Sequence, residues 1–114
     1  MCTVTFIPGN NNNFVLTSNR DEAPNRETLA PQKYSIKNSE LVFPKDTVAG
    51  GTWIGISNES KLICLLNGGF KAHERKESYR MSRGVIVRDL LTSEPILDVI
   101  KNYDFTDIEP FTIV

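Results

Sequence analysis

The sequence has few of the residues that build metal centres and disulfide frameworks. Its 114 residues include only two cysteines, Cys2 and Cys64, and a single histidine, His73. Two cysteines are too few for the disulfide framework of a small secreted domain, and one histidine cannot complete a zinc site with them. We therefore expect no metal and no cofactor.

The sequence also lacks a charge excess and a long apolar run. Thirteen Lys and Arg residues stand against fourteen Asp and Glu residues, so the formal net charge is -1. A chain with this balance has no overall field that would draw it to nucleic acid. No apolar run approaches the roughly 20 residues that span a bilayer, and no positively charged segment precedes an apolar one as in a signal peptide. We expect a cytoplasmic protein with no nucleic-acid partner and no membrane insertion.

The beginning of the chain predicts a β-hairpin. Residues 2–7 and 14–19 each alternate apolar and polar side chains, as half-buried strands do, and the turn cluster PGNNNN separates them. Matching the apolar faces pairs Phe6 with Phe14 and Cys2 with Ser18.

Later segments predict a mixture of strands and helices. Residues 22–38 contain Pro24 and Pro31, so we expect an irregular loop there. Residues 53–57 and 62–66 predict a second hairpin in which Ile54 and Ile56 meet Cys64 and Leu62. The remaining expected elements are a short strand at 41–43, a helix from about 80 to 91, a second helix with Ser93 as its N-cap, and a final strand in PFTIV.

Cys2 is the residue most able to carry chemistry. If Met1 is removed, the thiol and a free α-amine belong to the same residue. An α-amine with an ordinary pKa of about 7.7 to 8.0 can accept the thiol proton near neutral pH. The alternative is structural, because free cysteine is among the most buried residue types and Cys2 can simply pack beside Val4 and Phe6.

Three further residues are candidates for the same site. The predicted hairpin brings Arg20 and Asp21 beside the N-terminus. There Asp21 can hold an α-ammonium group, and Arg20 can lower the pKa of the thiol or bind a substrate carboxylate. A solvated ion pair is the alternative for both. Asn67, in the sequence Asn-Gly-Gly, is either a turn residue or a side-chain oxyanion donor.

The basic segment from 71 to 83 has two interpretations. Its Lys, Arg and His residues are interleaved with Glu74 and Glu77. This pattern favours a solvated loop, and a site for an anionic substrate is the alternative.

Four short stretches follow one another in the sequence: MCTVTF at the start, SNRDE at 18–22, GGTWIGIS at 50–57 and LLNGG at 65–69. In this order they resemble the NRDE family, also called the transport and Golgi organisation protein 2 family. The family is similar to the N-terminal-nucleophile hydrolases. The resemblance therefore implies an α+β fold, an αββα sandwich, in which residues 1–114 form a single domain and only the N-terminal half of the complete one.

The resemblance also implies a reaction. Cys2 would be the nucleophile, Arg20 and Asp21 would surround it, and Asn67 would be the oxyanion donor. The expected activity is hydrolysis of a non-peptide amide bond through a thioester, on a small molecule with an amide or acyl group. A retained Met1 would remove the basic amine. The alternative is therefore a non-catalytic protein that binds or carries a lipid or haem-like ligand in the same cleft.

Overall fold

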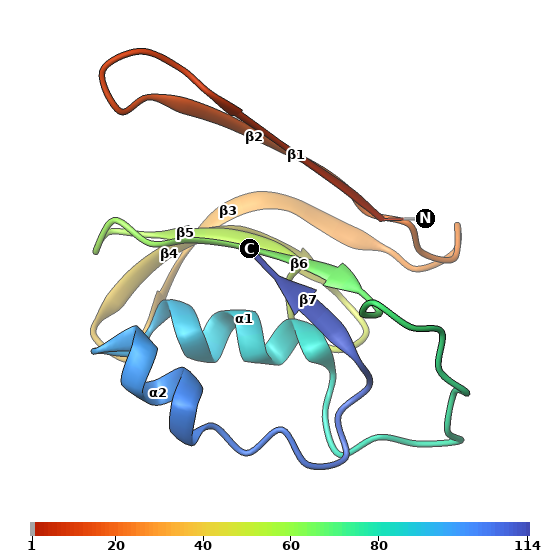
Figure 1. Ribbon diagram of the computed structural model, residues 1–114. Helices are drawn as coiled ribbons and strands as arrows, with labels where there is room; N and C mark the ends of the chain where they lie inside the picture. The colour runs from red at the N-terminus through yellow and green to blue at the C-terminus, as the bar shows by residue number, and fades with distance from the viewer. Residues whose placement is uncertain (1) are drawn as a thin grey trace.

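The computed structural model describes residues 2–114 and has an α+β architecture in three layers. A two-stranded hairpin lies over one face of a five-stranded antiparallel sheet, and two short helices cover the other face (Figure 1). The predicted α+β class is confirmed. The strands are β1 (Thr3–Pro8), β2 (Phe14–Asn19), β3 (Thr28–Ile36), β4 (Ser39–Asp46), β5 (Ile54–Ser57), β6 (Leu62–Asn67) and β7 (Phe111–Ile113), and the helices are α1 (Arg83–Leu91) and α2 (Ile96–Asn102).

The β1–β2 hairpin forms as predicted, but the predicted register is wrong by two residues. Phe6 pairs with Leu16 rather than with Phe14. The turn is tighter than expected, because Asn11 and Asn12 adopt positive φ angles of 56° and 61° and let both strands run to the turn. A shift of two residues keeps the same side chains on each face. Its consequence is that the pairing, continued by one residue, sets Cys2 opposite Arg20.

The region predicted to be an irregular loop contains the long strand β3, so that prediction is wrong. Prolines do not break this strand, because Pro31 lies in a β-bulge opposite Pro44 of β4. Leu29 pairs with Lys45 and Gln32 with Phe43, which leaves two residues of β3 facing one residue of β4. Neither proline has an N–H to donate, and a bulge is one of the places where a strand tolerates that.

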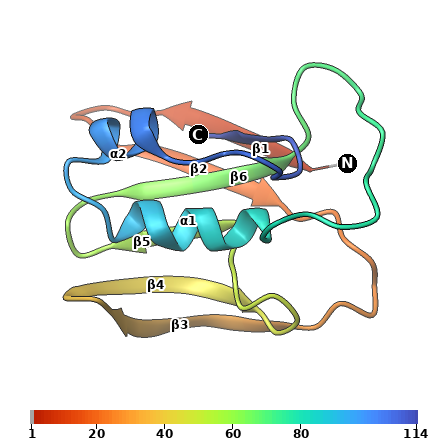
Figure 2. The ribbon, with the colours of Figure 1, turned by 90° about the horizontal axis from the view of Figure 1, so that it is seen from below.

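The second hairpin and the final strand confirm their predictions. β5 and β6 pair in the predicted register, with Ile54 opposite Cys64 and Ile56 opposite Leu62. β7 pairs antiparallel with β6 and closes the sheet order β3-β4-β5-β6-β7. β6 thus lies between β5 and β7, and its C-terminal end is at the end of the sheet where the hairpin begins (Figure 2). Asn67 is the last residue of β6.

Both predicted helices exist, with different N-termini. α1 begins at Arg83, and Pro95 rather than Ser93 is the N-cap residue of α2. α1 lies along β5 and β6 (Figure 2), and its apolar side supplies half of the core. None of the helices in residues 2–114 has the length and apolar character to cross a membrane. The buried core consists of Leu41, Phe43, Ile63, Leu65, Ile86, Val87, Leu90 and Leu91.

Two glycines bring the N-terminus of α1 against the loop before β5. A Cβ atom on Gly51 would lie 2.4 Å from the carbonyl carbon of Gly84, and one on Gly84 would lie 2.8 Å from the Thr52 nitrogen. In the native contact the Thr52 N–H donates to the Gly84 carbonyl at 3.1 Å. Only glycine, which has no Cβ atom, allows the two backbones to approach this closely.

We predict that Gly51→Ala destabilises the protein by about 1–3 kcal/mol, the usual cost of overpacking a tight contact. The added methyl group meets backbone, which cannot rotate away as a side chain can. Urea unfolding measures the effect. Gly69→Ala is the matched control, because a Cβ there meets nothing within 4 Å. Equal stability of the two variants would show that the close contact is not maintained in solution.

Candidate functional site

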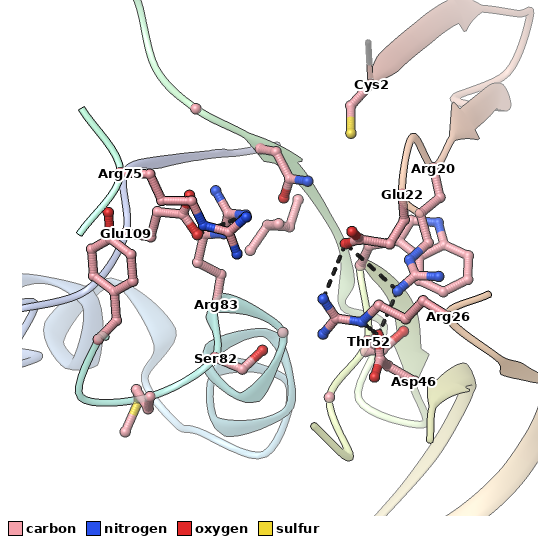
Figure 3. Close-up of a pocket in the computed structure, with 18 of the residues that line it drawn as sticks. Cys2, Arg20, Glu22, Arg26, Asp46, Thr52, Arg75, Ser82, Arg83 and Glu109 are labelled. Carbon is pink, nitrogen blue, oxygen red and sulfur yellow. Dashed lines mark hydrogen bonds and ion pairs between the residues drawn. The ribbon is translucent and has the colours of Figure 1, made fainter. Parts of the chain in front are cut away.

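A pocket of about 520 Å³ opens where Cys2, the ends of β2 and β6, and the start of α1 come together. Charged side chains form two clusters in it, one on each side of Cys2 (Figure 3). We call Arg20, Glu22, Arg26 and Asp46 the arginine–aspartate cluster, and His73, Arg75, Arg83 and Glu109 the Glu109 cluster.

Cys2 lies at the mouth of this pocket. It is partly exposed, and its sulfur points toward the space between the two clusters (Figure 3). The Sγ–H donates a long hydrogen bond to the main-chain carbonyl of Asp21, with 4.0 Å between sulfur and oxygen. The predicted proximity of Cys2 to Arg20 and Asp21 therefore exists in the structure. Met1, on whose removal the predicted amine depends, lies outside the described residues.

Asp46, at the end of β4, is the centre of the arginine–aspartate cluster. Its Oδ2 accepts hydrogen bonds from Arg20 and from Arg26, the latter at 2.6 Å. Its Oδ1 accepts the backbone N–H groups of Val48 and Ala49 at 3.0 and 2.9 Å. The side chain is only 7% exposed, so a buried carboxylate fixes two guanidinium groups on this wall of the pocket.

These contacts set the protonation of Asp46. Burial raises the pKa of its carboxyl group, but the Ala49 N–H, the hydrogen bond and charge of Arg26, and the Val48 N–H together outweigh burial and hold the pKa below its ordinary value of 3.8. Asp46 is therefore ionised at neutral pH.

Arg20 is more firmly engaged in the fold than the sequence suggested. Besides its bond to Asp46, it donates to Thr28 Oγ1 at 2.9 Å, and its guanidinium carbon lies 4.8 Å from the centre of the Trp53 ring. Cation–π contact and hydrogen bonds of this kind hold a guanidinium in one orientation. The Arg20 guanidinium pairs with Asp46 and Glu22, and the main-chain oxygen of Asp21 contacts Cys2.

Asn67 lies on the pocket wall at the end of β6. It pairs with Phe111 of β7 and is followed by Gly68, which has a φ angle of 83°. The side chain of Asn67 is exposed to the pocket, as an oxyanion donor must be. Three of the four predicted site residues, Cys2, Arg20 and Asn67, thus line one pocket, and the main-chain oxygen of the fourth, Asp21, contacts the Cys2 sulfur.

The second wall of the pocket is the Glu109 cluster. The carboxylate of Glu109 lies 3.1 Å from Arg83, 3.8 Å from Arg75 and 3.4 Å from the His73 ring nitrogen. Arg83 is the first residue of α1, so the N-terminus of this helix belongs to the same wall. The sequence interpretation of 71–83 as a solvated loop missed that His73, Arg75 and Arg83 meet Glu109 across 26 or more residues.

Cys64 lies in the sheet face below the hairpin and does not line the pocket. Its side chain is fully buried, and burial raises the pKa of its thiol. This agrees with its predicted role as a buried strand residue.

Some of the pocket has no signal in the sequence. Asp46 follows a strand as an ordinary charged residue, and Glu109 stands before a proline in a loop. Only the tertiary fold shows that both are acceptors for arginines from other segments. Within residues 2–114 there is no group of three or more His, Cys, Asp or Glu side chains placed to hold a metal ion.

Comparison with known proteins gives one consistent family. The sequence profile of the family described as Transport and Golgi organisation 2 matches residues 1–114. The chain is 34% identical over 103 residues to the Transport and Golgi organization 2 homolog of Mus musculus, and 30% identical over 102 residues to the Transport and Golgi organization protein 2 homolog of Bos taurus. Each match covers 82% of this chain and 36% of the relative, so the chain spans about a third of the length of these relatives. No solved structure matches the chain.

Proposed function

The chain belongs to the Transport and Golgi organisation 2 family, and we propose that in this chain Cys2 is the nucleophile of an amidase that cleaves a non-peptide C–N bond. The observation that carries the proposal is the position of the Cys2 sulfur. It is partly exposed, at the first residue before β1, and faces a pocket with arginines on both sides. A thiol that served only to pack the hairpin would lie in the interior, as Cys64 does.

The proposed reaction begins once Met1 has been removed. The α-amine of Cys2 takes the proton of the thiol, and the sulfur attacks the carbonyl carbon of the amide. The C–N bond then breaks, the amine leaves with the proton, and the acyl group stays on sulfur as a thioester. Water attacks the thioester, which releases the carboxylic acid and restores the thiol.

The neighbouring residues have distinct parts in this proposal. Asn67 donates its side-chain amide to the oxyanion that forms on the carbonyl oxygen. The main-chain oxygen of Asp21 accepts the long hydrogen bond from the Cys2 sulfur, and in this proposal the Asp21 carboxylate holds the α-ammonium group. Arg20 is a positioning residue, because Asp46, Thr28 and Trp53 already hold its guanidinium.

The layers of the fold support the relation to N-terminal-nucleophile hydrolases. The hairpin and the five-stranded sheet face each other, and helices cover the outer side of the larger sheet. These are three of the four layers of an αββα sandwich. We propose that residues 1–114 belong to one domain of that type. The expected cytoplasmic location stays a prediction.

A non-catalytic binding protein is the second candidate. The specific observation in its favour is that the Glu109 cluster can hold an anionic ligand without any chemistry at Cys2. In that case the ligand would bind to the same pocket and leave unchanged.

Covalent trapping separates these two functions. The purified protein is incubated with N-acyl p-nitroanilides of different chain lengths, quenched in acid and digested for peptide mass analysis. We expect an acyl adduct on Cys2, removable by hydroxylamine, and none on the buried Cys64. A version with an uncleaved N-terminal extension is the control and should form no adduct, because its Cys2 nitrogen is a non-basic amide. Release of p-nitroaniline without an adduct on Cys2 would contradict the assignment, and binding without release favours the carrier.

A further inference from the structure

The two charged clusters of the pocket differ in their charge balance. The arginine–aspartate cluster has two arginines and two carboxylates, so its charges cancel. The Glu109 cluster has Arg75 and Arg83 but only one carboxylate. It therefore carries a surplus positive charge even with a neutral His73, in a chain whose formal net charge is -1.

The surplus lies mainly on Arg75. Its Nε is 3.8 Å from the nearest Glu109 oxygen, too far for a hydrogen bond, and its side chain is 77% exposed. Among residues 2–114 the Arg75 guanidinium has no hydrogen-bond acceptor. Arg83, in contrast, is 15% exposed, donates to the Pro110 carbonyl at 3.0 Å and lies 3.1 Å from Glu109. One guanidinium is thus held rigidly, and the neighbouring one has its planar fork of donors available.

The start of α1 adds to the positive potential on this wall. Ser82 and Gly84 line the pocket with Arg83, and the side chain of Ser82 makes no capping hydrogen bond. First-turn N–H groups and the helix dipole favour an anion, although a helix N-terminus alone does not make a site. Here it reinforces the two arginines.

We propose that the Glu109 cluster binds a carboxylate of the molecule whose amide bond Cys2 attacks, so that the substrate is an N-acyl amino acid or a similar amide with a nearby carboxylate. This inference rests on the proposed function. A guanidinium fork matches the two oxygens of a carboxylate. A single surplus charge fits a monoanion. Arg20 is a poorer candidate for this role than the sequence suggested, because its guanidinium is already bonded to Thr28 and Asp46.

Two alkylating reagents of nearly the same size test the subsite directly. Iodoacetate carries a carboxylate and iodoacetamide a neutral amide, and both modify thiols. We expect the ratio of their rate constants at Cys2, iodoacetate over iodoacetamide, to be about tenfold higher than the ratio for N-acetylcysteine, since a cationic cleft concentrates anions. The Arg75→Gln substitution should remove most of that excess and bring the ratio close to the value for N-acetylcysteine. Raising the salt concentration should lower it as well.

Lys76→Gln is the matched control. It removes the same charge from the adjacent residue, but Lys76 pairs with Asp107 at 2.6 Å and does not line the pocket. Its reagent ratio should stay within about twofold of wild type. If iodoacetamide modifies Cys2 readily but iodoacetate shows no excess, or if Lys76→Gln lowers the ratio as much as Arg75→Gln does, the carboxylate subsite is wrong while the nucleophile proposal stands.

A binding measurement covers the case in which Cys2 reacts with neither reagent, an outcome that would count against the proposed function. N-acetylglycine and N-acetylglycinamide are titrated separately while the Nε–H signals of the arginines are followed by NMR. We expect saturable shifts for Arg75 and Arg83 with N-acetylglycine, at least tenfold weaker binding of the neutral amide, and loss of the Arg83 shift in Arg75→Gln. Equal binding of the two compounds, or no saturable shift, would overturn the subsite.

Discussion

Replacing Cys2 with alanine should abolish turnover of acyl p-nitroanilides, lowering kcat by a factor on the order of 10³ or more. No other described residue of the pocket is a comparable nucleophile, because the second thiol, Cys64, is buried and does not line the pocket. Removal of a nucleophile eliminates the acyl intermediate itself, so the loss should appear in kcat rather than in KM. Release of p-nitroaniline under saturating conditions measures it.

The control is the other cysteine. Cys64→Ala removes a thiol of the same chemistry from below the hairpin and should keep turnover within a few-fold of wild type, after correction for folded fraction. Binding of a non-hydrolysed amide to Cys2→Ala shows that the pocket is intact. Turnover that survives in Cys2→Ala, or that disappears in Cys64→Ala while the protein stays folded, would exclude Cys2 as the nucleophile.

Asp46→Asn should be the most destabilising single substitution at the site, costing about 3–5 kcal/mol. In the native protein Asp46 Oδ2 accepts hydrogen bonds from Arg20 and Arg26. In the variant a neutral amide takes its place, so both guanidinium groups lose their buried anion. Such a cost is a large share of the free energy of unfolding of a whole domain, which is typically about 5–15 kcal/mol. Urea unfolding at neutral pH measures the difference from wild type.

The same substitution has a predicted pH dependence. The pKa of Asp46 is lower in the folded protein than its ordinary value of 3.8. A carboxyl group of this kind contributes stability that is fully present above its unfolded pKa and is lost as the pH falls through its folded pKa. The difference between wild type and Asp46→Asn should therefore be constant from about pH 5 to 7 and shrink below about pH 4.

Glu40→Gln is the matched control for Asp46. Glu40 also forms an ion pair, with Lys33 at 2.6 Å, but both side chains are about half exposed or more. Its loss should cost no more than about 1 kcal/mol. An Asp46→Asn cost as small as that of Glu40→Gln, or one that grows on acidification, would contradict the buried-carboxylate interpretation.

Local patterns in the sequence predicted the parts of the fold that depend on neighbouring residues. The alternation of side chains around Ile54 and Cys64 was enough to predict the β5–β6 register. The two faces of that hairpin carry different side chains, and a slip of one residue would exchange them. The β1–β2 register depends on the conformation of the turn asparagines, and matching the apolar faces of the two strands does not reveal that conformation. β3 was missed because a proline in a bulge cannot be distinguished from a proline in a loop without the partner strand.

The candidate site divides in the same way. Cys2, Arg20 and Asp21 were found from the sequence, because a single hairpin brings them together. Asp46 and Glu109 were missed, because their partners lie 20 or more residues away. The partner of a charged residue cannot be predicted from the sequence until the position of the neighbouring strand or helix in the fold is known.

The pocket is assembled from residues far apart in the sequence, and this affects how the protein is made. Cys2 leaves the ribosome before Glu109, which lies in the opposite wall and is added 107 residues later. At about 5–20 residues per second, the nascent thiol is exposed for roughly 5–20 s before its pocket can close around it. Reactive electrophiles in the cell therefore have a brief opportunity to modify Cys2 during translation, before the finished pocket can select among them.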